Sequence, residues 1–196
     1  MKAAVNPRLA PIPNLLTLGR LVLAPIVCEL IVYEAVWAAI VVFAIASLTD
    51  WFDGFLARRW QVTSALGRQL DPLVDKVIVC GCFIALLAFP AERTGLRPWM
   101  VIVIVARELI LQALRSLIEG RGEAFGAKMA GKLKTTFQFL AILAMTLGLA
   151  YPPPWPWSLG RDLLTWTAVA LTIYSAGGYF VLAWPFLRRE LLGTRD

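Results

Sequence analysis

The sequence DWFDGFLAR, residues 50–58, is followed after eight residues by GRQLDPLVD, residues 67–75. Together the two stretches place four aspartates, Asp50, Asp53, Asp71 and Asp75, in or beside strongly apolar segments. An ionised carboxylate at the centre of a membrane helix costs on the order of 3 kcal/mol. A cluster of four such groups needs a cationic partner, which indicates metal ions and chemistry at a membrane.

Composition indicates an integral membrane protein. Of the 196 residues, 59% are hydrophobic and 16% are charged, whereas a soluble domain usually has about 25% charged residues. The chain contains no histidine, which removes the commonest general base and the commonest zinc ligand. Its three cysteines lie in apolar runs without metal-ligand spacing, so we interpret them as small buried hydrophobic residues.

Six apolar segments have roughly the 20 residues that cross a bilayer as a helix. They are residues 15–33, 35–56, 73–89, 99–118, 133–150 and 163–187. The sequence therefore predicts an all-α integral membrane protein with six transmembrane helices in a single domain, residues 1–196. We expect residues 1–14 to form an interfacial segment along the membrane surface and residues 188–196 to form a polar tail.

Positive charge orients the predicted helices. Six spans place both termini on one side, and if that side is the cytoplasm, 16 of the 19 Lys and Arg residues lie at cytoplasmic ends or loops. Only Arg93, Arg97 and Arg161 fall outside. The net charge of +6 thus indicates membrane orientation and not nucleic-acid binding. We expect a multi-pass protein of the cell (inner) membrane, with the acidic cluster and both termini facing the cytoplasm.

The spacing of the four aspartates predicts a metal site. Asp50 and Asp53 are three residues apart and Asp71 and Asp75 are four apart, so each pair stacks on one face of a helix. A short polar connection, about residues 59–70, makes the two helices antiparallel neighbours. Oxygen ligands favour Mg²⁺ or Mn²⁺, or Ca²⁺, over softer metals. Four carboxylates can hold two ions about 4 Å apart, an arrangement used for phosphoryl transfer.

The neighbouring residues fit a phosphate ligand, although single members have structural explanations. Gly54 leaves room beside Asp53, Arg58 offers a fork of donors suited to phosphate, and Gly67 allows a tight turn or a close approach to a ligand. Alternatively, Asp71 could cap a helix that begins with proline, and Gly54 could serve helix packing. Acids within membrane spans are functional by default, which favours the metal site.

The full spacing resembles a known signature. The pattern Asp50-x-x-Asp53-Gly54-x-x-Ala57-Arg58-x₈-Gly67-x₃-Asp71-x₃-Asp75 is similar to that of the CDP-alcohol phosphotransferase family, and all eight defining positions match. The resemblance extends over most of the chain. Three less specific flanking motifs resemble the bacterial phosphatidylglycerophosphate synthase branch of that family: Asn14-Leu-Leu-Thr17-Leu-Gly-Arg20, Arg107-Glu108 with Leu114-Arg115, and Gly131-Lys132-Leu-Lys134-Thr135.

The resemblance implies an activity and a set of roles. Members of the family transfer a phosphatidyl group from CDP-diacylglycerol to an alcohol and release CMP, and the resemblance also suggests a homodimer in the lipid bilayer. It implies two Mg²⁺ or Mn²⁺ ions held by Asp50, Asp53, Asp71 and Asp75, with Asp75 also the general base. It implies contacts to CDP-diacylglycerol from six residues: Asn14, Thr17, Gly54, Arg58, Ser64 and Gly67. Arg58 would also be catalytic, together with Asp75.

A second cluster of charged residues bears on the acceptor alcohol. Arg107, Arg115, Lys132 and Lys134 lie near the predicted cytoplasmic ends of the fourth and fifth spans. Arg107 lies about 12 Å deeper than Arg115 in a helix. Two interpretations stay open: a structural pair of Arg107 with Glu108 or the aspartates, or a pocket for an anionic acceptor, for which glycerol 3-phosphate fits.

Three other functions compete with glycerol 3-phosphate transfer. The same chemistry could use inositol phosphate, serine or phosphatidylglycerol as the acceptor. A cation or proton transporter also carries acids within the membrane, but here the acids gather at one end and no second set marks a path across. A catalytically silent scaffold is disfavoured by the intact set of acids.

Overall fold

The computed structural model is all-helical over the residues that it describes, which confirms the predicted all-α class. It describes the backbone of residues 11–60, 65–120, 129–151 and 155–192, and, within these ranges, the side chains of all but residues 11–14, 50–60, 65–72, 119, 129–132, 155–156, 182–183, 185–187 and 189–192. The helices in these ranges are α1 (Pro11–Val32), α2 (Val36–Trp60), α3 (Ala65–Leu86), α4 (Ala91–Thr94), α5 (Pro98–Glu119), α6 (Met129–Ala150) and α7 (Trp155–Leu192).

Each predicted span coincides with one long helix, although the bounds differ. Helix α3 begins at Ala65, eight residues before the predicted third span, because it continues through the polar segment that holds Asp71 and Asp75. The connection between α2 and α3 is therefore four residues long, and Gly67 lies in the first turn of α3 and not in a loop. Helix α1 begins at Pro11, within the predicted interfacial segment, since the fixed φ of proline suits a first helical turn.

The hydropathy of the described helices suits a membrane. Two segments are long and apolar enough to cross one, Leu15–Val32 and Leu133–Ala150, with mean hydropathies of 2.1 and 1.5 over 18 residues. A shorter apolar stretch, Val36–Thr49, lies in α2. Large apolar side chains are also exposed on the outer faces of the helices, for example Val22 and Ile102, as expected where lipid is the solvent. The count of six spans stays a prediction.

The chain divides into two compact units. The first comprises Met1–Thr94 with Met145–Pro152, and the second comprises Gly95–Ala144 with Pro153–Asp196. Helix α6 contributes residues to both units. The single domain that the sequence predicts stays a prediction.

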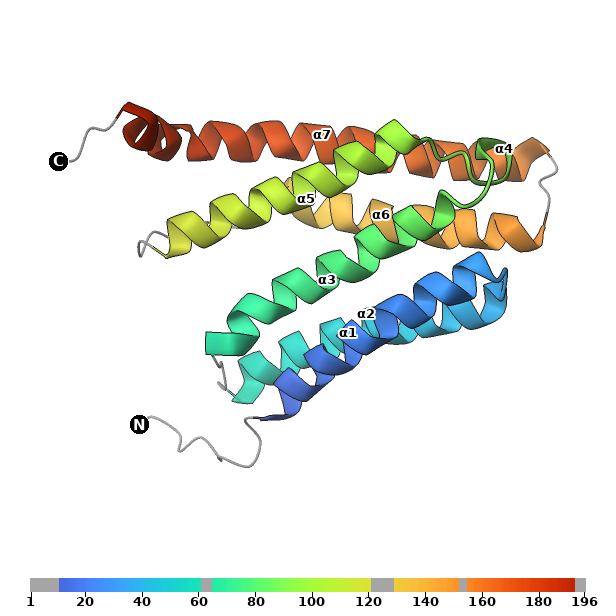
Figure 1. Cartoon of the computed structure of the whole chain (residues 1–196), viewed down its shortest axis with the longest axis horizontal. Coiled ribbons are helices and arrows are strands. Elements are labelled where there is room, and N and C mark those ends of the chain that lie inside the picture. Colours follow the sequence, from blue (N-terminus) through green and yellow to red (C-terminus); the bar gives the residue numbers. More distant parts are fainter. Residues whose placement is uncertain (1–10, 61–64, 121–128, 152–154, 193–196) are drawn as a thin grey trace. The chain divides into compact units, whose positions relative to one another are not determined.

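In the first unit, α1 packs against both α2 and α3. Helices α1 and α3 run in the same direction and α2 runs in the opposite one, so the start of α1, the end of α2 and the start of α3 share one end of the unit (Figure 1). Gly81 of α3 allows a close approach of α1, because a β-carbon at this position would lie 2.9 Å from Sγ of Cys28. The Cys28 thiol is also hydrogen-bonded to that of Cys82.

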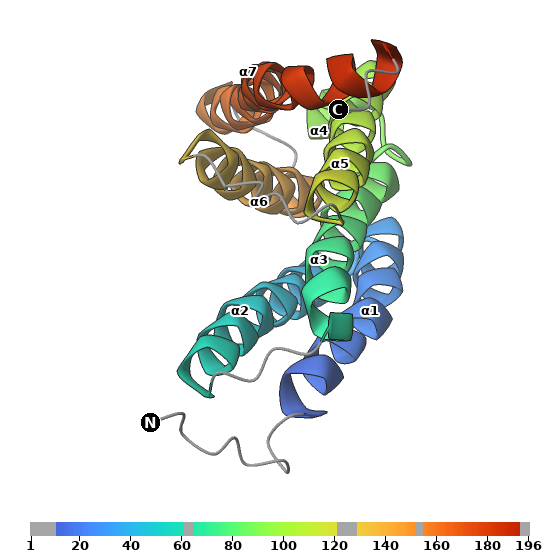
Figure 2. The ribbon, with the colours of Figure 1, turned by 90° about the vertical axis from the view of Figure 1, so that its left-hand side faces the viewer.

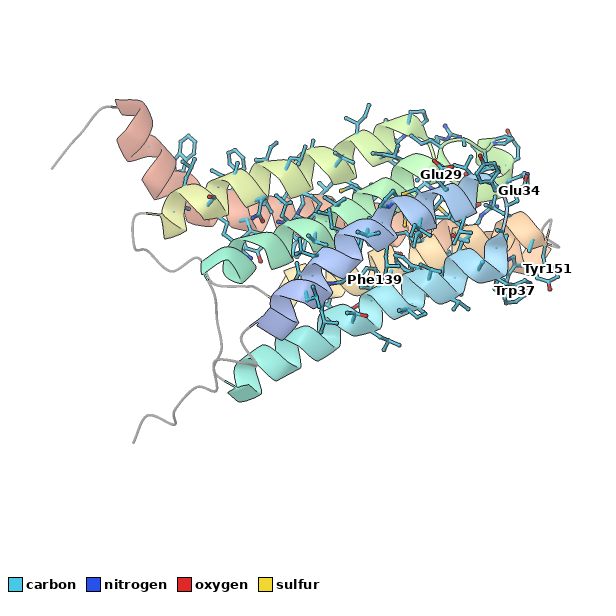
Figure 3. The ribbon with its side chains drawn as sticks, turned by 60° about the horizontal axis from the view of Figure 1, so that its bottom comes forward. Glu29, Glu34, Trp37, Phe139 and Tyr151 are labelled. Carbon is cyan, nitrogen blue, oxygen red and sulfur yellow. The ribbon has the colours of Figure 1, made fainter. Side chains whose placement is uncertain are left out.

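Arg93 holds the opposite end of the first unit together. Its guanidinium donates hydrogen bonds to both carboxylate oxygens of Glu34, at 3.1 and 2.6 Å, and to the carbonyl of Leu149 at 2.9 Å. Leu149 belongs to the last turn of α6, where carbonyls lack partners within the helix. Glu34 lies at the same end as Trp37 and Tyr151, whose rings meet edge to face at 6.4 Å (Figure 3).

Glu34 closes the turn between α1 and α2. Its φ of 55° lies in the left-handed region. The amide of Ala35 donates to the Leu30 carbonyl at 2.9 Å and that of Glu34 to the Ile31 carbonyl at 3.0 Å, which is the Schellman ending of a helix. Glycine usually occupies this position because a β-carbon is strained there. The contact with Arg93 gives a physical reason for a glutamate.

In the second unit, α5, α6 and α7 contact one another pairwise (Figure 2). Lys134 of α6 donates to Glu108 of α5, and Gln138 of α6 donates to Thr172 of α7 at 3.1 Å. Both Gln138 and Thr172 are buried. The second unit therefore has a polar interior, in which each of these side chains is paired across a helix interface.

A separate ion pair lies at the start of α7 in the second unit. The buried Arg161 donates from Nε to Oδ1 of its neighbour Asp162 at 2.9 Å. Gly95, with a φ of 71°, lies against this pair, and a β-carbon there would overlap with Oδ1 of Asp162. Arg93 and Arg161, two of the three cations that the sequence placed away from the cytoplasm, thus each have a carboxylate partner.

The close approach of α1 and α3 predicts the effect of filling Gly81. We expect Gly81→Ala to lower the thermal unfolding midpoint of the detergent-purified protein, since overpacking a helix interface costs about 1–3 kcal/mol. Removing the Cys28 thiol as well, in Cys28→Ala/Gly81→Ala, should restore most of the loss. Gly177→Ala in α7 is the control, because a β-carbon there has no neighbour within 4 Å. Equal stability of Gly81→Ala and the wild type would contradict the packing.

The contact between Glu34 and Arg93 predicts a pH dependence of stability. The Arg93 guanidinium lowers the pKa of Glu34, chiefly through the hydrogen bond to its carboxylate. The stabilisation is therefore present above the ordinary glutamate pKa of about 4.3 and is lost as the pH falls through the lowered value. Unfolding midpoints measured from pH 7 downward should fall more steeply for the wild type than for Glu34→Gln. Parallel curves for the two proteins would refute this contribution.

Candidate functional site

The backbone places the four aspartates at matching heights on α2 and α3. Asp50 lies ten residues before the end of α2 and Asp75 ten residues after the start of α3, while Asp53 and Asp71 lie seven and six residues from those ends. At 1.5 Å per residue, the outer pair lies about 15 Å and the inner pair about 10 Å from the connection. Because the helices run in opposite directions and are joined by four residues, each aspartate on α2 has a counterpart at its own level on α3.

The carboxylates of the four aspartates are suitable ligands for a divalent cation, but no described contact tests whether they bind one. Carboxylate oxygens are the ligands that Mg²⁺ and Mn²⁺ prefer. Among the described side chains, no three Asp, Glu, Cys or His residues come together as a metal site. The side chains of Asp50, Asp53 and Asp71 lie outside the described residues, and that of Asp75 is half-buried in α3. Metal binding by the four acids therefore stays a prediction.

Five of the six residues predicted to contact CDP-diacylglycerol have a described backbone, and all five lie at the end of the first unit that also carries the aspartates. Asn14 and Thr17 lie in the first two turns of α1, Gly54 and Arg58 in the last two turns of α2, and Gly67 in the first turn of α3. The side chains of Asn14 and Arg58 lie outside the described residues, as does Ser64 entirely. The structure thus gathers their helices without testing their contacts.

Helix α1 adds a residue that the sequence analysis did not assign to the site. Thr17 and Arg20 are both 1% exposed, and they continue the buried stripe of α1 formed by Ala24, Val27 and Ile31. Arg20 is therefore a fully buried cation on the face of α1 that packs within the first unit. The sequence contained a signal for this burial, because Arg20 lies inside an apolar span. It follows Thr17 by three residues, about one helical turn, and so lies on the same helix face.

In the second unit, the structure brings together two of the four residues predicted for the acceptor. Oε1 of Glu108 accepts hydrogen bonds from the Arg107 guanidinium, at 2.9 Å, and from the Lys134 ammonium. The side chains of Arg107, Glu108 and Lys134 are 9%, 4% and 5% exposed. The structural pairing of Arg107 with Glu108, one of the two interpretations left open above, is therefore present, and it includes Lys134 as well.

Arg107 is further fixed by α7. Its Nη2 donates to Oγ of Ser175 at 3.1 Å, and its guanidinium carbon lies 5.6 Å from the ring centre of Tyr179. The Ser175 hydroxyl in turn donates to the carbonyl of Thr172 at 3.1 Å. Nothing in the sequence marked Ser175 or Tyr179, since they are 68 and 72 residues from Arg107 and lie in an otherwise apolar helix.

The other two predicted acceptor residues are less defined. Arg115 is half-buried in α5, two turns beyond Arg107, and it has interactions of its own. Lys132 lies in the first turn of α6, and its side chain is outside the described residues. Among the described side chains, Arg107 and Lys134 thus form a buried cluster with Glu108.

Comparison with known proteins identifies the family. The model of the CDP-alcohol phosphatidyltransferase family matches residues 10–174. A CDP-diacylglycerol–glycerol-3-phosphate 3-phosphatidyltransferase of Bacillus subtilis is 36% identical over 90% of this chain and 97% of its own length. Proteins of the same name from Yersinia enterocolitica and Cereibacter sphaeroides are 37% and 33% identical, over 90% and 94% of this chain and 96% and 97% of their own lengths.

The match covers α1 to α6 and about the first half of α7, including both stretches that carry the aspartates. The relatives are matched over nearly their whole lengths, so the similarity is not confined to a shared segment. The resemblance drawn from the eight signature positions is thereby confirmed. The chain belongs to the CDP-alcohol phosphatidyltransferase family of membrane-bound enzymes.

Proposed function

We propose that this enzyme transfers the phosphatidyl group of CDP-diacylglycerol to sn-glycerol 3-phosphate, giving phosphatidylglycerophosphate and CMP. The observation that carries the proposal is the full-length similarity to relatives that are named for this reaction. The two buried cations Arg107 and Lys134, gathered around Glu108, support an anionic acceptor. Phosphatidyl transfer to inositol phosphate, serine or phosphatidylglycerol is the alternative, while family membership favours an enzyme over a transporter.

The four aspartates are proposed to hold two divalent cations, Mg²⁺ or Mn²⁺. The support is their matching heights on two antiparallel helices and the oxygen-only donor set. When bound, such ions would supply positive charge against the diphosphate of the substrate. Arg58 would add a fork of donors to the same diphosphate, and Gly54 and Gly67 would leave room for the nucleotide. Asn14, Thr17 and Ser64 would complete the nucleotide contacts.

Asp75 is proposed as the general base. The chain contains no histidine, so a carboxylate is the natural group to take a proton from the acceptor hydroxyl. The hydroxyl oxygen would then attack the phosphorus that bears the lipid, and CMP would leave without a covalent enzyme intermediate. The half-buried position of Asp75, at the level of Asp50 but further from the connection than Asp71, suits contact with both a metal and the acceptor.

The membrane arrangement is also a proposal. Six spans, cytoplasmic termini and a cytoplasmic site agree with six long helices and with the distribution of 16 of the 19 cations. The exposed apolar faces of these helices would contact lipid or a second copy of the chain in a homodimer. At the cytoplasmic membrane surface, a lipid head group, a nucleotide and a soluble phosphate can meet.

Neutralising the proposed base should separate binding from turnover. In Asp75→Asn, we expect CDP-diacylglycerol to bind with near-normal affinity while turnover falls by about 10²-fold or more, because the amide cannot accept the hydroxyl proton. The measurement is CMP release against substrate concentration. Glu92→Gln is the control, since Glu92 is an exposed carboxylate in α4 of the same unit. Near-normal turnover of Asp75→Asn would remove Asp75 from this role.

The choice of acceptor is tested by a panel of alcohols. Detergent-purified protein with CDP-diacylglycerol should release CMP only when both sn-glycerol 3-phosphate and Mg²⁺ or Mn²⁺ are present. Inositol phosphate, serine, phosphatidylglycerol and glycerol are supplied in parallel reactions, and a chelator removes the metal. Product formed with another alcohol and not with glycerol 3-phosphate would overturn the proposed acceptor while leaving the family assignment intact.

A further inference from the structure

Two thiols meet where α1 packs against α3 in the first unit. The Cys28 thiol of α1 is hydrogen-bonded to the Cys82 thiol of α3, and Gly81 leaves the space that the Cys28 sulfur occupies beside that helix. Cys82 is fully buried, whereas Cys28 is half-buried. A small reagent can therefore reach one thiol, while the other is held against it.

The two cysteines lie at the same level of the first unit. Helices α1 and α3 run in the same direction (Figure 1), and each cysteine lies four residues before the last residue of its helix, Val32 or Leu86. At 1.5 Å per residue, both cysteines are about 6 Å from that end. A bond between the two sulfurs would therefore join helix segments that already lie side by side.

The third cysteine does not share this position. Cys80 precedes Cys82 by two residues, which is about 200° around the axis of α3, so the two side chains leave the helix on different faces. Cys80 is half-buried, as Cys28 is. It therefore provides a comparison thiol of similar exposure in the same helix as Cys82.

We propose that Cys28 and Cys82 form a disulfide under oxidising conditions, and that this bond fixes α1 to α3. With hydrogen peroxide as the oxidant, the O–O bond breaks, the Cys28 sulfur takes up one OH group as a sulfenic acid, and the thiol proton leaves with the other as water. The Cys82 sulfur then attacks the Cys28 sulfur, the S–O bond breaks, and a second water leaves. Two thiols are oxidised to one disulfide, and the peroxide is reduced to two waters.

The bond would restrict the chain far beyond the two residues. It joins positions 54 residues apart, with the whole of α2 between them, and a crosslink over a long separation limits the unfolded chain most. The S–S bond is about 2.05 Å long, so sulfurs already in contact need only a short approach. Thr17 and Asp71 each precede the cysteine of their helix by eleven residues, about 16 Å. The disulfide thus fixes the alignment of these helices at a distance from the proposed site.

The location of the two cysteines favours the oxidised form. If the aspartates face the cytoplasm, as proposed above, the cysteines lie toward the opposite side of the membrane. Disulfides persist outside the cytosol, where glutathione and thioredoxin do not reduce them. Formation of the bond in the purified protein does not depend on this orientation.

The experiment treats the detergent-purified protein with hydrogen peroxide, denatures it, and alkylates the remaining thiols for mass spectrometry. The reduced wild type should take up three alkyl groups, one for each cysteine, and the oxidised protein a single group at Cys80. Digestion should give a crosslinked peptide pair that contains Cys28 and Cys82 and that a reductant separates. The unfolding midpoint of the oxidised protein should lie about 5 °C or more above that of the reduced protein.

Variants of the same helices provide the controls. Cys80→Ser keeps the pair and should gain the same stability on oxidation. Cys28→Ser and Cys82→Ser each lack one partner, so their unfolding midpoints should not rise with peroxide. Gly81→Ala should slow formation of the bond, because its β-carbon would lie 2.9 Å from the Cys28 sulfur and displace it, whereas Gly177→Ala should not.

Four results would each overturn the proposal. They are three alkyl groups on the peroxide-treated wild type, a disulfide that uses Cys80 or joins two chains, oxidation of Cys28 to a sulfinic acid without a crosslink, and equal unfolding midpoints of the oxidised and reduced protein. If Cys82→Ser does not fold, Cys28→Ser at the half-buried position gives the same comparison. None of these measurements depends on the acceptor alcohol or on metal ions, so this inference and the proposed function can fail separately.

Discussion

The cost of placing charge inside apolar helices organises this protein. A buried ion needs a partner of opposite charge, and the described residues supply such partners within the chain: Asp162 for the buried Arg161, and Glu108 for both Arg107 and Lys134. The aspartates of α2 and α3 belong to one end of the first unit, and the metal ions proposed for them would supply the opposite charge.

The two units carry complementary parts of the proposed chemistry. The first unit contains the acidic segments of α2 and α3, together with the start of α1, and these suit metal ions and a nucleotide diphosphate. The second contains the buried cations Arg107 and Lys134, which share the carboxylate of Glu108. If the carboxylates of the first unit bind metal ions and the cations of the second bind an anionic alcohol, as proposed, one small chain handles two phosphorylated substrates.

Much of the fold could be predicted from the sequence, because apolar segments of membrane length are a local signal. Each of the six predicted spans has its helix, and the eight signature positions identified the family before any coordinates. The bounds of α3 were missed because polar residues at its start resemble a loop in hydropathy, although they continue the helix to Ala65. The short helix α4 was not predicted, because its four residues are too few to show a helical pattern of apolar positions.

Contacts between distant residues could not be predicted in the same way. Arg93 and Glu34 are 59 residues apart, and Lys134 and Glu108 are 26 apart. In the sequence, Arg93 was only an exception to the charge distribution, and Lys134 was interpreted as a possible ligand for the acceptor, since a single charged residue does not indicate its partner. Only packing revealed that Glu108 is shared.

The most direct test is the anomalous scattering of Mn²⁺ in crystals of the protein with a cytidine diphosphate ligand. The account predicts two manganese peaks between α2 and α3, within coordination distance of Asp50, Asp53, Asp71 and Asp75, and their loss in Asp53→Asn. Manganese bound elsewhere, with none at these four carboxylates, would contradict the central claim.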